Sequence, residues 1–175
     1  YQAYVVGGAV RDLLLGLNPG DFDLTTSAKP EQVLAVARAQ NFGSVDKLGQ
    51  NFGVVVLTVP GHTVEVATFR GERYGTDVHR PAEVWYCERL EEDLGRRDFT
   101  VNAMAMDVQG TVYDFYQGRE DLQKKIMRTV GEPEQRFAED ALRMYRACRF
   151  VAQLNFTYAG ELPFNIANCR ELSLE

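Results

Sequence analysis

Hydrophobic and polar positions along the chain follow two periods, and together they predict a mixed fold of strands and helices. Residues 4–6 form a short apolar run that two glycines end, and residues 9–15 have the apolar spacing of a helix. Residues 21–25 alternate polar and apolar side chains, which predicts a strand with one solvated face. Residues 30–40 open with a proline and are expected to form a helix. The expected buried side of that helix carries Val33, Leu34, Val36 and Ala37.

The middle of the chain is expected to hold a hairpin, a loop and a further helix. Residues 52–59 and 63–69 are β-like runs separated by the turn dipeptide Pro60-Gly61. Residues 70–84 are rich in charge, glycine and proline, which predicts a mobile loop. Residues 97–106 are expected to be largely helical.

A helical segment is expected to follow the mixed unit. Residues 111–115 predict a short strand, and residues 136–154 predict one long helix. Leu142, Tyr145 and Phe150 are among the apolar positions of that helix. The predicted fold class is therefore α+β, with a small mixed sheet flanked by helices over residues 1–122 and an all-α segment over residues 123–175.

Composition narrows the possible compartments and partners. Apolar residues make up 45% of the chain, enough for a globular core, and no run of about 18 apolar residues predicts a membrane span. The three cysteines show no CxxC pairing, which argues against a disulfide framework or a structural zinc site. We therefore expect a reducing compartment, the cytoplasm. The net charge of −6 indicates that the chain holds a long RNA poorly by itself, unless its basic residues share one face.

The pair Asp21 and Asp23 is the first candidate for chemistry. Two residues apart in a predicted strand, their side chains project from the same face. Such carboxylates can bind one or two Mg²⁺ ions, and a two-metal site activates an attacking hydroxyl while it stabilises a leaving pyrophosphate. Two solvated acids after a turn are the alternative interpretation.

Glu65 is the candidate third carboxylate. It lies in a predicted strand that is otherwise apolar on both sides, where a carboxylate is costly unless it has a partner such as a metal. Alternatively, it is an acid on an edge strand that limits aggregation.

The order strand, Gly7-Gly8, helix is what a phosphate-binding turn requires. Backbone N–H groups at Gly8 can approach phosphate oxygens because no side chain intervenes. Arg11, one turn into the helix, can neutralise a triphosphate. An ordinary turn is the alternative, although the Asp-x-Asp pair follows about a dozen residues later.

Four ordered motifs resemble the class II nucleotidyltransferases of the polymerase-β superfamily, which comprise bacterial-type tRNA CCA-adding enzymes and poly(A) polymerases. The motifs lie at residues 7–16, 20–26, 92–105 and 131–150, and the resemblance covers about residues 4–155. It implies a polymerase-β-like catalytic head over residues 1–122. It also implies a truncated helical neck over residues 123–175 that carries a nucleobase-selecting helix.

The resemblance implies a role for each matching residue. Asp21 and Asp23 hold two catalytic Mg²⁺ ions, with Glu65 as the third carboxylate. Residues that contact the triphosphate and ribose are Gly8, Arg11, Arg97, Asp98 and Asn102. Residues of the base pocket are Asp140, Arg143, Arg146 and Arg149.

Asp140 and Arg143 lie one turn apart, so an acceptor and a forked donor can face one base together. Cytosine and adenine both carry an exocyclic amine beside a ring-nitrogen acceptor, whereas uracil and guanine offer a carbonyl there. A protein surface can thus select C or A without a nucleic-acid template. A surface helix with ion pairs at this spacing is the alternative.

The implied activity is template-independent addition of C and A to the tRNA 3′ end from CTP and ATP, with no membrane association. RNA would be held mainly by domains outside this chain. A bacterial poly(A) polymerase or A-adding enzyme is the alternative, and an inactive nucleotide- or RNA-binding head is a remote one.

Two segments bear on that choice. Asp77, Arg80 and Pro81 resemble the flexible element of CCA-adding enzymes, although His79 stands where arginine is common. Leu48-Gly49-Gln50-Asn51-Phe52 departs from the patterns of both CCA-adding enzymes and poly(A) polymerases.

Overall fold

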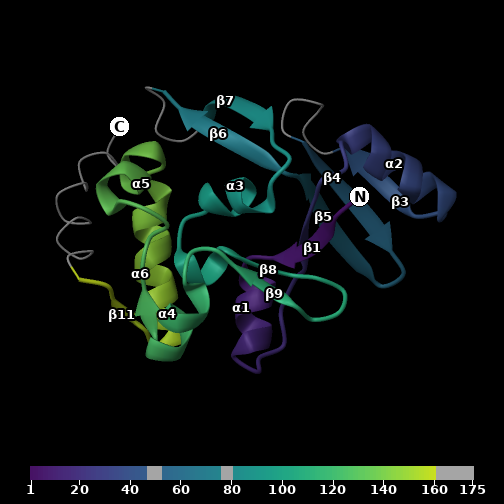
Figure 1. Ribbon diagram of the computed structural model, residues 1–175. Coiled ribbons are helices and arrows are strands. Elements are labelled where there is room, and N and C mark those ends of the chain that lie inside the picture. The colour runs from purple at the N-terminus through teal and green to yellow at the C-terminus, as the bar shows by residue number, and fades with distance from the viewer. Residues whose placement is uncertain (47–52, 76–80, 161–175) are drawn as a thin grey trace.

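The computed structural model describes residues 1–46, 53–75 and 81–160, and its centre is a seven-stranded mixed sheet (Figure 1). Across the sheet the strands are β3 (Gly43–Asp46), β4 (Val54–Val59), β5 (His62–Thr68), β2 (Asp23–Thr26), β1 (Ala3–Val6), β8 (Met104–Met106) and β9 (Val112–Asp114). Strands β2 and β5 pair in parallel, and the other pairs are antiparallel. The predicted α+β class is confirmed.

Helices cover both faces of the sheet because successive residues of β1 point to opposite sides. Val5 packs in the cluster that contains Val10 of α1 (Gly8–Leu14). Its neighbour Val6 packs against Leu94 of α3 (Leu90–Gly95). Helix α2 (Pro30–Ala39) buries Val33 against β4 and β5 at the far end (Figure 1).

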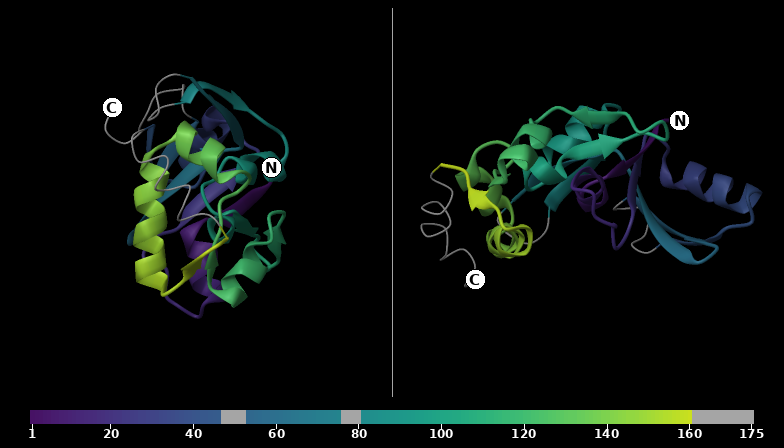
Figure 2. Two further views of the ribbon diagram at one scale, coloured as in Figure 1. Left: turned by 90° about the vertical axis from the view of Figure 1, so that its left-hand side faces the viewer. Right: turned by 90° about the horizontal axis from the view of Figure 1, so that it is seen from below.

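The C-terminal elements lie at the end of the molecule opposite to α2, as Figure 2 shows. They are α4 (Gly118–Lys124), β10 (Ile126–Met127), α5 (Pro133–Glu139), α6 (Leu142–Leu154) and β11 (Thr157–Tyr158). A single hydrophobic cluster joins Val10 and Met104 of the sheet region to Met144 and Phe150 of α6. The division at residue 122 stays a prediction, and the two parts share this core. The second part is not all-α as expected, because β10 and β11 pair in parallel.

Most early elements lie where the sequence predicts them, with one shift that matters. The strand at 4–6, the helices at 9–15 and 30–40 and the hairpin after residue 52 are confirmed. However, β2 begins at Asp23, so Asp21 precedes the strand instead of sharing it. Val36, expected to be buried, is 53% exposed.

The predicted loop at 70–84 is wrong. Its described part forms the antiparallel strands β6 (Arg70–Tyr74) and β7 (Pro81–Tyr86). Gly71 permits the pairing because a Cβ there would lie 2.4 Å from ring atoms of Trp85. Asp77, His79 and Arg80 lie outside the described residues, as do residues 48–52.

The predicted helix at 97–106 is also wrong. A 3₁₀ turn at Thr100–Asn102 and strand β8 occupy this stretch. Side chains compete for the backbone here, because the carboxylate of Asp98 accepts the N–H of Phe99 at 2.8 Å. Pairing of β8 with β1 then stabilises an extended chain.

The predicted long helix at 136–154 is two helices separated at Asp140, whose backbone is extended. The Asp140 carboxylate accepts the N–H of Leu142 at 2.9 Å, which favours a new helix start. Of the apolar positions named for this helix, Leu142 and Tyr145 are 53% and 61% exposed, whereas Phe150 is buried. Across the described parts of the chain, no helix is long and apolar enough to span a membrane.

Candidate functional site

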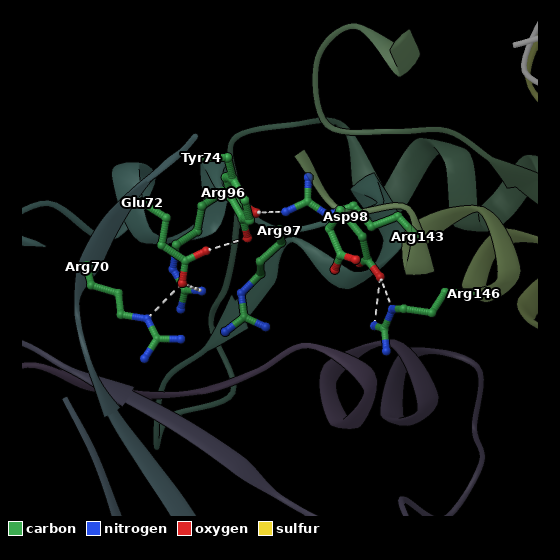
Figure 3. A pocket seen from close by; sticks show the side chains of 9 residues that line it. Arg70, Glu72, Tyr74, Arg96, Arg97, Asp98, Arg143 and Arg146 are labelled. Carbon is green, nitrogen blue, oxygen red and sulfur yellow. Dashed lines mark hydrogen bonds and ion pairs between the residues drawn. The ribbon is translucent and has the colours of Figure 1, made fainter. Parts of the chain in front are cut away.

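A positively charged pocket of about 330 Å³ opens between β6, the segment after α3 and helix α6 (Figure 3). Five arginines and three carboxylates supply most of its lining, although the whole chain carries a net charge of −6. The lining residues are Arg70, Glu72, Tyr74, Arg96, Arg97, Asp98, Asp140, Arg143 and Arg146. Such a surface suits an anionic ligand.

Arg97 is the cation in this pocket best suited to an added anion. Its side chain is 19% exposed, and its buried Nε has no hydrogen-bond partner among the described residues. Burial lowers the pKa of Arg97, and Asp93, 3.9 Å away, offsets only part of this effect. A Cβ on Gly7, whose φ is +73°, would lie 3.0 Å from Nη1 of Arg97. The glycine turn therefore lies directly beside this guanidinium.

Asp98 connects the predicted triphosphate residues to helix α6. One carboxylate oxygen accepts from Nδ2 of Asn102 at 3.3 Å, and the other accepts from Nε of Arg146 at 2.7 Å. The amide oxygen of Asn102 accepts in turn from Nη1 of Arg11 at 2.8 Å. Four predicted site residues thus form one hydrogen-bonded chain.

Arg11 is more enclosed than a simple phosphate-binding side chain. It is 8% exposed, its Nε donates to Asp12 at 2.8 Å, and its guanidinium lies 5.1 Å from the ring centre of Phe150. Gly8 begins α1 beside it, and a Cβ there would lie 3.5 Å from Nη2 of Arg11. Neither residue lines the pocket, and their contact with a triphosphate stays a prediction.

The predicted base-reading pair lies inside the pocket. Arg143 is 5% exposed, and it donates to Glu139 at 2.8 Å and to the carbonyl oxygens of Arg96 at 3.1 Å and Arg136 at 3.2 Å. Asp140 lines the same pocket from the break between α5 and α6. Arg149, one turn beyond Arg146, is exposed and does not line it.

The catalytic candidates Asp23 and Glu65 are direct partners on the parallel strands β2 and β5, so both side chains leave the same face of the sheet. Partial burial, and then the negative charges of Asp21 and Glu65, raise the pKa of Asp23, while Arg97 lowers it. The three carboxylates and Arg97 thus share one electrostatic environment.

Two interpretations of Glu65 are wrong. Strand β5 lies between β4 and β2, so Glu65 is not on an edge strand. It is exposed, so the cost of burying a carboxylate does not apply either.

The negative charges of Asp21, Asp23 and Glu65 suit the binding of a divalent cation. Partial burial, and then repulsion from Asp21 and Glu65, raise the pKa of Asp23, and a bound cation would relieve that repulsion. No group of three or more acidic, His or Cys side chains within the described ranges is close enough to hold a metal by itself. Mg²⁺ commonly binds through one or two carboxylates and takes its other ligands from water and phosphate. Asp23 and Glu65 can accommodate an ion bound in this way.

Four pocket residues escaped the sequence analysis: Arg70, Glu72, Tyr74 and Arg96. Glu72 joins three of them, because it accepts from Arg70 at 3.0 Å, from Arg96 at 2.9 Å and from Tyr74 at 3.0 Å. The available signal was their spacing, since residues 70, 72 and 74 share one face of a strand. The charge and glycine content of the segment obscured it.

Comparison with known proteins finds a matching family and several relatives of similar sequence. The model of a family described as the poly(A) polymerase head domain matches residues 3–128. A CCA-adding enzyme of Geobacillus stearothermophilus is 52% identical over 161 residues, which cover 92% of this chain and 39% of that protein. One from Bacillus subtilis strain 168 is 46% identical over 172 residues, which cover 98% and 42%. The chain spans about two-fifths of the length of these relatives.

Solved structures are similar as well. The Bacillus stearothermophilus CCA-adding enzyme in complex with CTP matches with a TM-score of 0.82 and 48% identity, over 94% of this chain and 38% of that one. A tRNA nucleotidyltransferase complexed with a primer tRNA and an incoming ATP analogue matches with a TM-score of 0.76 and 33% identity, over 98% and 47%.

Proposed function

Because the chain belongs to the poly(A) polymerase head-domain family, we propose that it is the catalytic part of an enzyme that adds C and A to the tRNA 3′ end from CTP and ATP. The observation that carries the proposal is that Asp140 and Arg143 line the same positively charged pocket as Arg97. Base-reading groups and a cation suited to a triphosphate are thus within one nucleotide's reach. The similarity to enzymes named as CCA-adding supports this function.

In the proposed complex, the nucleotide lies across the pocket with its triphosphate toward Arg97 and Gly7 and its base toward α6. The RNA 3′ hydroxyl gives up its proton to solvent, and its oxygen forms a bond to the α-phosphorus. The bond from the α-phosphorus to the oxygen that bridges it to the β-phosphate breaks, and pyrophosphate leaves with that electron pair. Arg97 neutralises the developing charge on the leaving group. Asp23 and Glu65, with Asp21, would hold Mg²⁺, which supplies charge stabilisation and acidifies the attacking hydroxyl.

Base selection in this proposal is made by side chains alone. Arg143 donates to the ring nitrogen of cytosine or adenine while Asp140 accepts from the exocyclic amine. Uracil and guanine present a carbonyl to Asp140, which leaves two acceptors facing each other. The three hydrogen bonds of Arg143 to Glu139 and to two carbonyl groups keep its guanidinium in place for this task.

The remaining expectations form part of the same proposal. The RNA body would be held by regions beyond this chain, which spans about two-fifths of its relatives. The cytoplasm stays the predicted compartment. A poly(A) polymerase or A-adding enzyme stays the second candidate, because the matching family is named after the head domain of poly(A) polymerase.

Nucleotide incorporation tests the proposal. The full-length protein receives a tRNA that lacks its terminal CCA, and separately a tRNA that ends in CC, with Mg²⁺ and with each nucleotide singly and together. Two C additions, one A addition and a stop are expected. A run of A residues on any RNA would instead indicate a poly(A) polymerase, and A addition only to tRNA ending in CC an A-adding enzyme. Nucleotide binding without any product would indicate an inactive head.

A further inference from the structure

Tyr74, at the end of β6, contacts Arg143, the arginine proposed to read the base. The guanidinium carbon of Arg143 lies 5.6 Å from the centre of the Tyr74 ring. The Tyr74 hydroxyl donates to Glu72 at 3.0 Å, so the ring is tied at its far end (Figure 3). Burial and the charge of Glu72 raise the pKa of Tyr74 to about 12, so the hydroxyl stays a donor at neutral pH.

The contacts of Arg143 are of two kinds. Its hydrogen bonds to Glu139 and to the carbonyl oxygens of Arg96 and Arg136 hold the edge of the guanidinium, because N–H groups point outward in its plane. A ring face instead restrains rotation of that plane, through cation–π attraction within about 6 Å. A forked donor reads a base only when its plane matches that of the base.

We propose that Tyr74 is a positioning residue for base selection, whose ring fixes the plane of the Arg143 guanidinium toward the incoming base. The inference rests on the proposed function. Glu72 anchors the ring through the hydroxyl and is itself bound by Arg70 and Arg96. Strand β6 thereby shapes the base-reading surface of α6 although it precedes α6 by more than sixty positions in the sequence.

The same hairpin supplies a matched control. On the opposite face of β6, the Arg73 guanidinium lies 5.9 Å from the ring of Trp85 on β7. Neither residue lines the pocket. Trp85→Leu therefore removes a cation–π contact from the same two strands without touching Arg143.

The test compares Tyr74→Leu, Tyr74→Phe and Trp85→Leu with the wild type, all as full-length protein, by the ratio of kcat/KM for CTP to kcat/KM for UTP. Tyr74→Leu should lower this ratio about tenfold, the order expected for one desolvated cation–π contact. Tyr74→Phe keeps the ring and should restore the ratio, while its melting temperature falls because Glu72 loses a donor. Trp85→Leu should leave the ratio unchanged.

The outcomes separate this inference from the proposed function. A wild type that incorporates neither C nor A contradicts the proposed function itself. A selective wild type with an equally selective Tyr74→Leu variant overturns the role of Tyr74 alone. Equal loss of selectivity in Tyr74→Leu and Trp85→Leu also overturns it, because that result points to general disruption of the hairpin.

Discussion

Arg146 and Asp98 lie 48 positions apart in the sequence and meet in an ion pair of 2.7 Å. The pair joins α6 to the segment that follows α3. Asp98 is 7% exposed and also accepts from the N–H of Phe99, so one enclosed carboxylate holds a helix against the region of the sheet. This contact, together with the hydrophobic core, holds α6, the helix proposed to read the base.

We expect this ion pair to be energetically coupled. A double-mutant cycle with Arg146→Ala and Asp98→Asn, followed by urea unfolding, should give a coupling energy of about 1 kcal/mol. The value is modest because the Arg146 side chain is 44% exposed. Arg149→Ala, on the same helix, should show no coupling to Asp98→Asn. A coupling energy indistinguishable from that control would show that the pair does not fix α6.

Removal of the Asp23 charge should separate activity from stability. Asp23→Asn should lower turnover about a hundredfold or more, because it weakens the charge stabilisation of the reacting centre. In the wild type, the pKa of Asp23 is raised in the folded state, so the Asp23 carboxylate binds a proton more tightly in the folded protein than in the unfolded one. In the absence of divalent ions, this stabilisation is present below pH 3.8, the ordinary value, and is lost as pH rises through the raised pKa.

Melting curves over a pH series, with and without Mg²⁺, check this sign. In EDTA, the wild type should lose stability relative to Asp23→Asn as pH rises through that range. Mg²⁺ should reverse the difference at neutral pH. Identical pH profiles of the two proteins in EDTA would contradict the raised pKa of Asp23.

Gly7 should be required for nucleotide binding because a side chain there would displace Arg97, and not only because of its backbone conformation. Gly7→Ala forces a side chain into φ +73° and displaces Nη1 of Arg97, so the KM for CTP should rise. Gly61→Ala is the control, with a φ of +81° and no atom within 4 Å of the added Cβ. Gly61→Ala should lose about 1–2 kcal/mol of unfolding free energy. Gly7→Ala should lose more, because with φ +73° and ψ −135° its backbone lies in a region that is open almost only to glycine. An equal KM in the two variants would contradict the role of the Gly7–Arg97 approach.

Arg143→Ala should reduce discrimination between CTP and UTP about tenfold, since one of two base-reading groups is lost. It should also lower the unfolding free energy by about 1.5–3 kcal/mol, because charged hydrogen bonds to Glu139 and two carbonyl groups disappear. Arg149→Ala should retain full discrimination. Competition assays with mixed nucleotides measure the ratio, and unchanged discrimination in Arg143→Ala would remove this residue from base selection.

The two described cysteines should differ in reactivity. Burial, with the charges of Asp93 and Glu92, raises the pKa of Cys87 to about 11, so its reactive thiolate is scarce at neutral pH. Cys148 is exposed on α6. Brief iodoacetamide treatment and peptide mass spectrometry should find Cys148 alkylated first, and a predominance of Cys87 would contradict the enclosed environment assigned to it.

The motifs predicted the family correctly, and the hydrophobic periods predicted the fold class, because both depend on short-range spacing. The motifs predict Asp140, Arg143, Arg97 and Asp98 as site residues, and all four line one pocket. The chemistry of a family is carried by such ordered motifs. The resemblance to nucleotidyltransferases is accordingly confirmed by the matching family model.

The failures arise where long-range contacts override local preference. Residues 97–106 have a helical composition, but pairing of β8 with β1 makes part of them a strand. The break at Asp140 depends on one side-chain hydrogen bond, which periodicity cannot detect. Tyr74 was assigned to a loop because its role follows from a contact with Arg143, on an element far along the chain.

The hydrophobic cluster that runs from Val10 and Met104 to Met144 and Phe150 has a consequence for engineering. One surface of helix α6 presents Arg143 and Arg146 to the pocket. Another surface packs Met144 and Phe150 into the core. Transplanting it from a relative to alter nucleotide preference would therefore also import foreign packing volumes. Compatible grafts would have to carry matching partners from α1 and β8, so specificity and foldability in this protein are inherited together.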